Sequence, residues 1–229
     1  MPSRKQEERD MNKTVAMAAI LAIGVTSAAF GPARADSKTV NITRDLPAVE
    51  VLHQGKPVRV ERNPDTENML DPDFSLTSRA CPPYCIQPAS LGPGVETLGE
   101  LEMLDYLKRV GRDPNVLVID SRDGDWAQRS GVIPGAVVIP WQELHPGHTD
   151  PDKVAEHLVF RFGAARLGPL WNFENAKTLV FYCNGPWCGQ SPTNIKQLLS
   201  LGYPAYKIKW YRGGMQDWKM LGLTTVAPK

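Results

Sequence analysis

Continuous apolar runs in the C-terminal part of the chain alternate with segments in which apolar residues recur at helical spacing. The runs are rich in β-branched residues, as is typical of buried strands, and lie at 116–119, 136–139 and 178–182. The segments with helical spacing predict helices and lie at 98–110, about 154–162 and 195–202. Strands that alternate with helices predict an α/β layered domain with a mostly parallel sheet, over residues 96–229.

Residues 36–95 have a different pattern and form an accessory segment. Two short apolar stretches, 49–52 and 57–60, flank a turn that contains Gly55, which predicts a small hairpin. Residues 63–78 are polar and without a period, so we expect a loop there. Because the segment has too little apolar material for a core of its own, we expect it to wrap against the domain that follows.

The N-terminus carries a pattern of export. An apolar run from Val15 to Phe30 follows a lysine and ends near Ala33-Arg34-Ala35, a small-residue pattern suited to signal peptidase. We therefore predict a signal peptide over residues 1–35, cleaved after Ala35, and a periplasmic protein with no membrane segment after cleavage. The alternative is an uncleaved N-terminal anchor. The periplasm is oxidising, so disulfides can persist there.

Charge is balanced along the sequence and narrows the classes of partner. The chain has 26 Lys and Arg against 25 Asp and Glu, a formal net charge of +1. A nucleic-acid partner is usually matched by a basic field. We therefore expect no nucleic-acid partner, and we expect no cofactor.

Cys183 stands where the third apolar run ends, and this position suggests chemistry. Ligands of open α/β sheets bind at the carboxyl ends of strands, and Ser191-Pro192 predicts a helix start just beyond the loop. The amides at a helix N-terminus stabilise an anion, so we expect a lowered thiol pKa and a nucleophilic thiolate at Cys183. The other predicted residues of this anion-binding loop are Asn184, Gly185, Pro186, Trp187, Gly189, Gln190 and Ser191.

Each of these residues also has a simpler interpretation. Cys183 alone could be a buried structural cysteine. Cys188 could close a disulfide with Cys183 as a resolving thiol, or could itself be the nucleophile, being nearer the predicted helix start. Trp187 could wall the pocket and protect a persulfide from water, or could pack as an ordinary large aromatic residue.

Three segments, taken together, resemble the rhodanese-like family. They are Val118 to Arg122 with Asp125-Trp126 and Gly131 to Pro140, the loop from Tyr182 to Ser191, and Trp210 to Trp218 with Gly222-Leu223. The resemblance spans about 96–226 and implies one rhodanese-like domain, with helices on both faces of a central parallel sheet. It also implies sulfur transfer: the cysteine takes a sulfane sulfur from a small anion such as thiosulfate, becomes a persulfide and passes the sulfur to a thiophilic acceptor, for example a protein thiol.

The sequence departs from the family pattern in the loop. About two extra residues separate Cys183 from Ser191, and Gln190 stands where the family often has an arginine. Lys209 and Arg212 are the candidates to supply the missing cation, although each is more simply a solvated surface charge. Asp120 and Arg122 are expected to pair within the fold rather than to act in chemistry.

Cys81 and Cys85 form a second pair, in the sequence Cys-Pro-Pro-Tyr-Cys. We expect a structural disulfide rather than a metal site, because a zinc site usually needs four ligands. A further hypothesis is that this segment folds over the active-site loop and exchanges disulfides with Cys183 or Cys188. Two alternatives to sulfur transfer stay open: a thiol–disulfide redox protein that uses Cys183 and Cys188, and a non-catalytic binding module.

Overall fold

The computed structural model describes residues 39–228, so the predicted signal peptide lies outside the described residues. A parallel sheet of five strands forms the centre of the fold, in the order β3-β9-β8-β4-β5. Its strands are β3 (Glu96–Leu98), β4 (Val116–Asp120), β5 (Val137–Val138), β8 (Thr178–Tyr182) and β9 (Ile208–Tyr211). The three apolar runs are therefore strands of one parallel sheet, as predicted.

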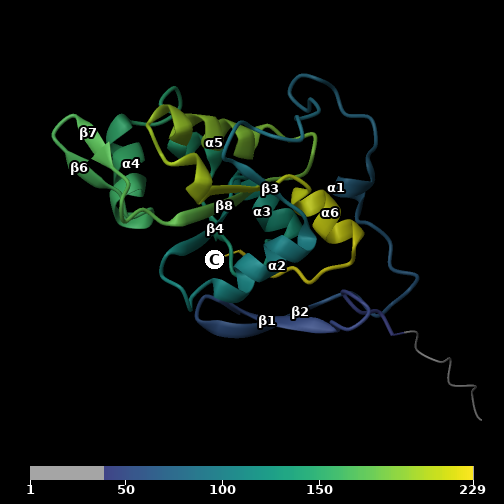
Figure 1. Ribbon diagram of the computed structural model, residues 1–229. Helices are drawn as coiled ribbons and strands as arrows, with labels where there is room; N and C mark the ends of the chain where they lie inside the picture. Colours follow the sequence, from purple (N-terminus) through teal and green to yellow (C-terminus); the bar gives the residue numbers. More distant parts are fainter. Residues whose placement is uncertain (1–38, 229) are drawn as a thin grey trace, which may run out of the picture. The chain divides into compact units, whose positions relative to one another are not determined.

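Helices cover both faces of this sheet (Figure 1). On one face lie α2 (Glu100–Arg109), α3 (Gly124–Ser130) and α6 (Gly214–Met220), and on the other lie α4 (Pro151–Glu156) and α5 (Gln190–Ser200). Side chains alternate along β8, so Val180 packs into the core beneath α2 and α6 while Phe181 packs into the core beneath α4 and α5. This arrangement confirms the three-layer α/β fold.

The first predicted helix begins later than its leucine spacing indicates. Leu98 is the last residue of β3, and α2 begins after Gly99, whose extended backbone separates the two elements. The Glu102 carboxylate accepts a hydrogen bond from the Gly99 amide at 3.1 Å and caps the helix. As a result Leu101 is 48% exposed, and Met103 takes its place in the core.

Between β5 and β8 the chain is more varied than the sequence pattern predicts. A 3₁₀ turn at Trp141–Leu144 follows β5, and the predicted helix near 154–162 consists of α4 and a π-helical turn at His157–Arg161. The hairpin of β6 (Ala165–Leu167) and β7 (Leu170–Asn172) was not predicted, because most of its residues are exposed and apolar and polar residues do not alternate along it. A 3₁₀ turn at Ala205–Lys207 leads into β9.

The accessory segment packs into the core of the domain, as predicted. Strands β1 (Ala48–His53) and β2 (Lys56–Glu61) form the expected antiparallel hairpin. Val51 and Val60, which are fully buried, share one apolar core with Leu104 and Leu107 of α2. The expected loop at 63–78 holds one helical turn, α1 (Pro72–Ser75), which buries Phe74 in the same core.

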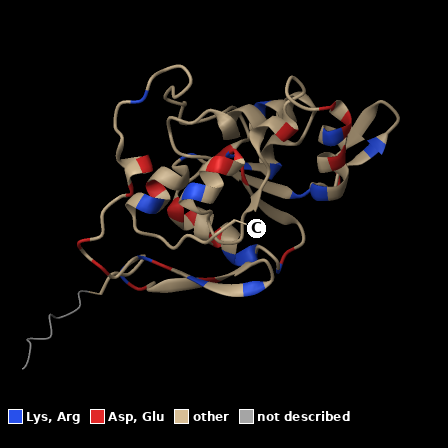
Figure 2. Ribbon diagram, turned by 180° about the vertical axis from the view of Figure 1, so that it is seen from behind, with Lys and Arg blue, Asp and Glu red and all other residues tan. Residues whose placement is uncertain are grey.

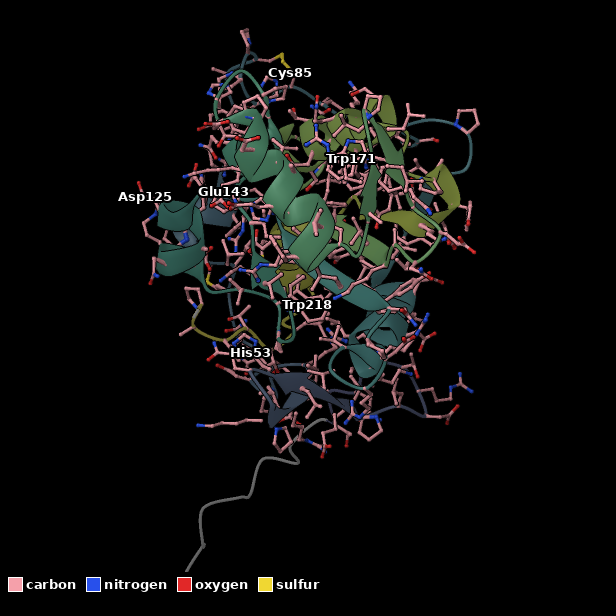
Figure 3. The ribbon with its side chains drawn as sticks, turned by 90° about the vertical axis from the view of Figure 1, so that its left-hand side faces the viewer. His53, Cys85, Asp125, Glu143, Trp171 and Trp218 are labelled. Carbon is pink, nitrogen blue, oxygen red and sulfur yellow. A yellow bond between two sulfur atoms is a disulfide. The ribbon has the colours of Figure 1, made fainter. Side chains whose placement is uncertain are left out.

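The accessory segment extends from one end of the domain to the other (Figure 3). The hairpin that carries His53 lies at one end of the domain, and the disulfide at Cys85 lies at the opposite end (Figure 3). Basic and acidic residues are interspersed along most elements (Figure 2). Within residues 39–228, every helix is too short or too polar to span a bilayer.

Candidate active site

Cys183 lies directly after β8, in the position predicted for it, and is 2% exposed. Its carbonyl oxygen accepts a hydrogen bond from the Met215 amide at 3.0 Å, and the carbonyl of Asn184 accepts one from Gln216 at 2.8 Å. Both donors lie in the first turn of α6, so the start of this helix fixes the backbone of the cysteine loop. This contact becomes possible because residue 214 has no side chain.

The loop after Cys183 closes back on itself before α5 begins. The Cys188 amide donates to the Gly185 carbonyl at 2.9 Å, and the Cys183 thiol donates to the Cys188 carbonyl at 3.4 Å. The helix begins at Gln190, one residue before the predicted cap at Ser191, because the Gly189 carbonyl already accepts the first helical hydrogen bond, from Thr193. Ser191 is therefore buried within the first turn of α5.

The environment of Cys183 favours its thiolate. Burial raises the pKa of the Cys183 thiol, but the polar groups around it, the Cys188 and Ser191 side chains and the Ser191 and Gly185 amides, lower the pKa by more. The resulting pKa is about 7, against an ordinary value of 9.0. Burial and the neighbouring Cys183 sulfur raise the pKa of Cys188 well above that value. Of the two free thiols, Cys183 has the charge state of a nucleophile at neutral pH.

The accessory segment folds over this loop. The Gln87 amide donates to the Pro186 carbonyl at 2.8 Å, which joins the two backbones. The guanidinium carbon of Arg79 lies 3.9 Å from the centre of the Trp187 ring, and the Tyr84 ring meets Trp187 edge-on at 5.6 Å. Trp187 is thus packed under the segment, and the packing interpretation describes it better than that of a pocket wall.

The two candidate cations from β9 have other partners. Lys209 pairs with Glu96 at 2.7 Å. Arg212 donates to the carbonyls of Gln87 and Pro88 at 2.9 and 3.0 Å. Arg212 therefore positions the accessory segment rather than replacing the arginine that the loop lacks.

Cys81 and Cys85 are joined by a disulfide, with their Cα atoms 4.7 Å apart. The ring that the disulfide closes contains Pro83 and Tyr84, and both of these residues line a pocket that Cys188 also lines. The hypothesis about this segment had two parts. The first part agrees with the structure, in which the segment covers the cysteine loop. Exchange of disulfides between the two pairs stays a prediction.

The pocket beside Cys188 has a volume of about 400 Å³. It is lined by Pro83, Tyr84, Asp123, Trp126, Trp141, Gln142, Asn184, Cys188, Gly189, Gln190 and Thr193. Of the predicted loop residues, Asn184, Cys188, Gly189 and Gln190 face this pocket, whereas Cys183, Gly185, Pro186, Trp187 and Ser191 do not line it.

Sequence reasoning missed the pocket residues Asp123, Trp126, Trp141 and Gln142. A signal for them was present, because Asp123 closely follows β4 and Trp141 closely follows β5. The carboxyl ends of parallel strands lie at the same edge of a sheet, so residues that closely follow β4 and β5 are expected to lie near Cys183, which follows β8. Within the described residues, no cluster of three or more His, Cys, Asp or Glu side chains is suited to hold a metal ion.

Asp120 and Arg122 form a buried network, as expected. Both side chains are fully buried and paired at 2.5 Å. Arg122 also donates to Ser130 and to the Gly131 carbonyl, both at 2.6 Å, and the Tyr182 hydroxyl donates to Asp120 at 2.9 Å. Because the charges are fully paired, this network holds α3 against β4 and β8 and has no free group for catalysis.

Comparison with known proteins identifies the family. The sequence profile of the rhodanese-like domain matches residues 103–221, which is more than half of the 229 residues. No curated protein matches the chain.

Several solved structures are similar to this one. A Rhodopseudomonas palustris protein of unknown function, described as a possible tyrosine phosphatase, is 22% identical over 59% of this chain and 88% of its own, with a TM-score of 0.40. A Pseudomonas aeruginosa thiosulfate sulfurtransferase is 20% identical over 59% of this chain and 21% of its own, with a TM-score of 0.38. A human single-domain sulfurtransferase is 23% identical over 56% of this chain and 97% of its own, with a TM-score of 0.34. With the matching profile and the sheet described above, the chain belongs to the rhodanese-like domain family.

Proposed function

We propose that the protein is an exported, periplasmic sulfurtransferase or sulfane-sulfur carrier that forms a persulfide on Cys183. The observation that carries this proposal is the position of Cys183 at the end of β8, where the side chains of Cys188 and Ser191 and the amides of Ser191 and Gly185 lower its pKa to about 7. The same donors would hold the anionic outer sulfur of a persulfide. Little proton transfer is needed when the thiolate is already formed.

The proposed reaction has two displacement steps. The Cys183 thiolate attacks the outer sulfur of a donor such as thiosulfate, a sulfur–sulfur bond forms, and sulfite leaves with the electron pair of the broken bond. An acceptor thiolate then attacks the same sulfur. The persulfide bond breaks, and its electron pair returns to Cys183 as a thiolate.

Peptide mass measurement tests the proposal. We expect the protein purified from periplasm without reductant to start at Asp36, and thiosulfate to add the mass of one sulfur to the peptide that holds Cys183. Cyanide should remove that sulfur as thiocyanate. Cys188→Ser should still load, and Cys183→Ser should not. Sulfur found on Cys188 instead, or on neither cysteine, would overturn the assignment.

A second candidate function is thiol–disulfide exchange between Cys183 and Cys188. The observation that favours it is that both cysteines are free, buried and in contact within one loop. A reversible Cys183–Cys188 disulfide in the unloaded protein, together with failure to accept sulfur, would select this function.

A further inference from the structure

The pocket beside Cys188 has aromatic walls from three separate parts of the chain. Tyr84 comes from the disulfide loop, Trp126 from α3, and Trp141 from the 3₁₀ turn after β5. Aromatic faces attract organic cations through the negative charge density of their rings. A pocket lined by three such residues is therefore suited to a positively charged ligand.

The charge of the pocket has the matching sign. Among the described residues that line it, Asp123 is the acidic one, and none is Lys, Arg or His. One carboxylate oxygen of Asp123 caps α3 by accepting from the Trp126 amide, and the other accepts only a weak hydrogen bond, at 3.4 Å, from the Gln190 side chain. Asp123 therefore keeps the capacity to bind a donor from a ligand.

Two arginines approach the aromatic residues from outside the pocket. The guanidinium carbon of Arg79 lies 5.7 Å from the centre of the Tyr84 ring, and that of Arg129 lies 4.7 Å from the centre of the Trp126 ring. Arg79 also donates to the Asp73 carbonyl, and Arg129 pairs with the Asp73 carboxylate. Neither lines the pocket. The residues that line the pocket thus supply one carboxylate and no basic side chain to balance it, which favours a cationic group of a ligand over an anionic one at this wall.

The sulfur end of the pocket has the opposite preference. Cys188 and Gly189 lie where α5 begins, and the Cys183 sulfur is 3.4 Å from the Cys188 carbonyl oxygen. The helix N-terminus stabilises negative charge there. One ligand that satisfies both preferences has a thiolate and an ammonium group separated by a few atoms.

We propose that this pocket binds a small aminothiol, with its ammonium group against Asp123 and the aromatic side chains and its sulfur toward Cys183. This inference rests on the proposed function and names its acceptor. In the step, the aminothiol thiolate attacks the outer sulfur of the Cys183 persulfide. The old sulfur–sulfur bond breaks, Cys183 returns as a thiolate, and the aminothiol leaves as its persulfide.

Binding of unreactive analogues tests the ligand class without any sulfur transfer. Three molecules of similar size are titrated against tryptophan fluorescence: 2-(methylthio)ethylamine, 2-(methylthio)ethanol and 3-(methylthio)propionate. We expect the amine to bind roughly tenfold more tightly than the alcohol, and the carboxylate to bind more weakly still. Asp123→Asn, which preserves the helix cap, should remove most of this preference.

Asp125→Asn is the matched control. Asp125 is exposed in the same first turn of α3 and does not line the pocket, so its loss changes the net charge equally. The preference for the amine should survive in this variant. Equal binding of the three analogues, or an equal effect of the two substitutions, would overturn the proposal.

Sulfur transfer to cysteamine, 2-mercaptoethanol and 3-mercaptopropionate separates this inference from the proposed function. With rates expressed per thiolate, the loaded protein should discharge roughly tenfold faster to cysteamine than to mercaptoethanol. If a persulfide forms but the three acceptors react equally, the acceptor class is wrong and the proposed function stands. If no persulfide forms while the amine analogue still binds through Asp123, the proposed function is wrong and the ligand class stands.

Discussion

At Gly214 the backbone φ angle is +54°, and a Cβ atom there would overlap the carbonyl oxygen of Cys183. Gly214→Ala should therefore displace the cysteine loop and destabilise the protein by at least about 2 kcal/mol. Denaturant unfolding measures this cost. The matched control is Gly124→Ala at the start of α3, where an added Cβ meets no atom within 4 Å. Equal stability of the two variants would contradict this account of the loop.

The charge state of Cys183 gives a prediction of pH dependence. The thiolate is the reactive form, so alkylation of reduced Cys183 should increase with pH through a midpoint near 7 and fall about tenfold for each pH unit below it. Ser191→Ala should move the midpoint upward, because the hydroxyl group lowers the pKa of this thiol. Peptide mass after iodoacetamide treatment reports both values. A midpoint near 9 would mean that the loop does not stabilise the thiolate.

At the scale of elements, the disulfide loop and the residues after it contact the cysteine loop at Trp187 and Pro186. Replacing Cys81 and Cys85 with serine opens a ring of five residues, and chain entropy predicts a loss of roughly 2 kcal/mol. The disulfide holds Tyr84 and Gln87 near their contacts with Trp187 and Pro186, and opening it should weaken these contacts. We therefore expect faster hydrogen exchange in peptides covering 80–90 and unchanged exchange in β8. Protection of 80–90 equal to that of the native protein would show that Arg212 and Arg79 suffice to hold the segment.

The sequence predicted the central elements because their signals are local. The apolar runs of β4 and β8 and the hairpin of β1 and β2 are each visible within a few residues, and so is the position of Cys183 after its strand. The loop contacts are not local. Arg212 reaches Gln87 across 125 positions, and Gln216 reaches the Phe74 carbonyl across 142. Because no periodicity in the sequence indicates such pairs, the packing of the accessory segment over the cysteine loop and the aromatic pocket beside Cys188 could be found only in the structure.

At the scale of the whole molecule, the hairpin and the sheet share one core. The side chain of Val51 is fully buried against the same cluster as Leu107 of α2 and Trp218 of α6. An element that completes another element's core cannot unfold alone without exposing it. We therefore expect the accessory segment and the rhodanese-like domain to unfold as one cooperative unit.

Val51→Ala tests this coupling, because it removes two buried methyl groups far from the cysteine loop. We expect a loss of roughly 2–3 kcal/mol in the free energy of unfolding. Tryptophan fluorescence, which reports mainly on the sheet and the pocket, should shift to the same lower denaturant midpoint as far-ultraviolet circular dichroism. Val58→Ala on β2 is the control, since Val58 is only partly buried and its loss should cost less. If the Val51 variant unfolds in two separate steps, the hairpin is an independent addition to the domain and the shared core contributes little to stability.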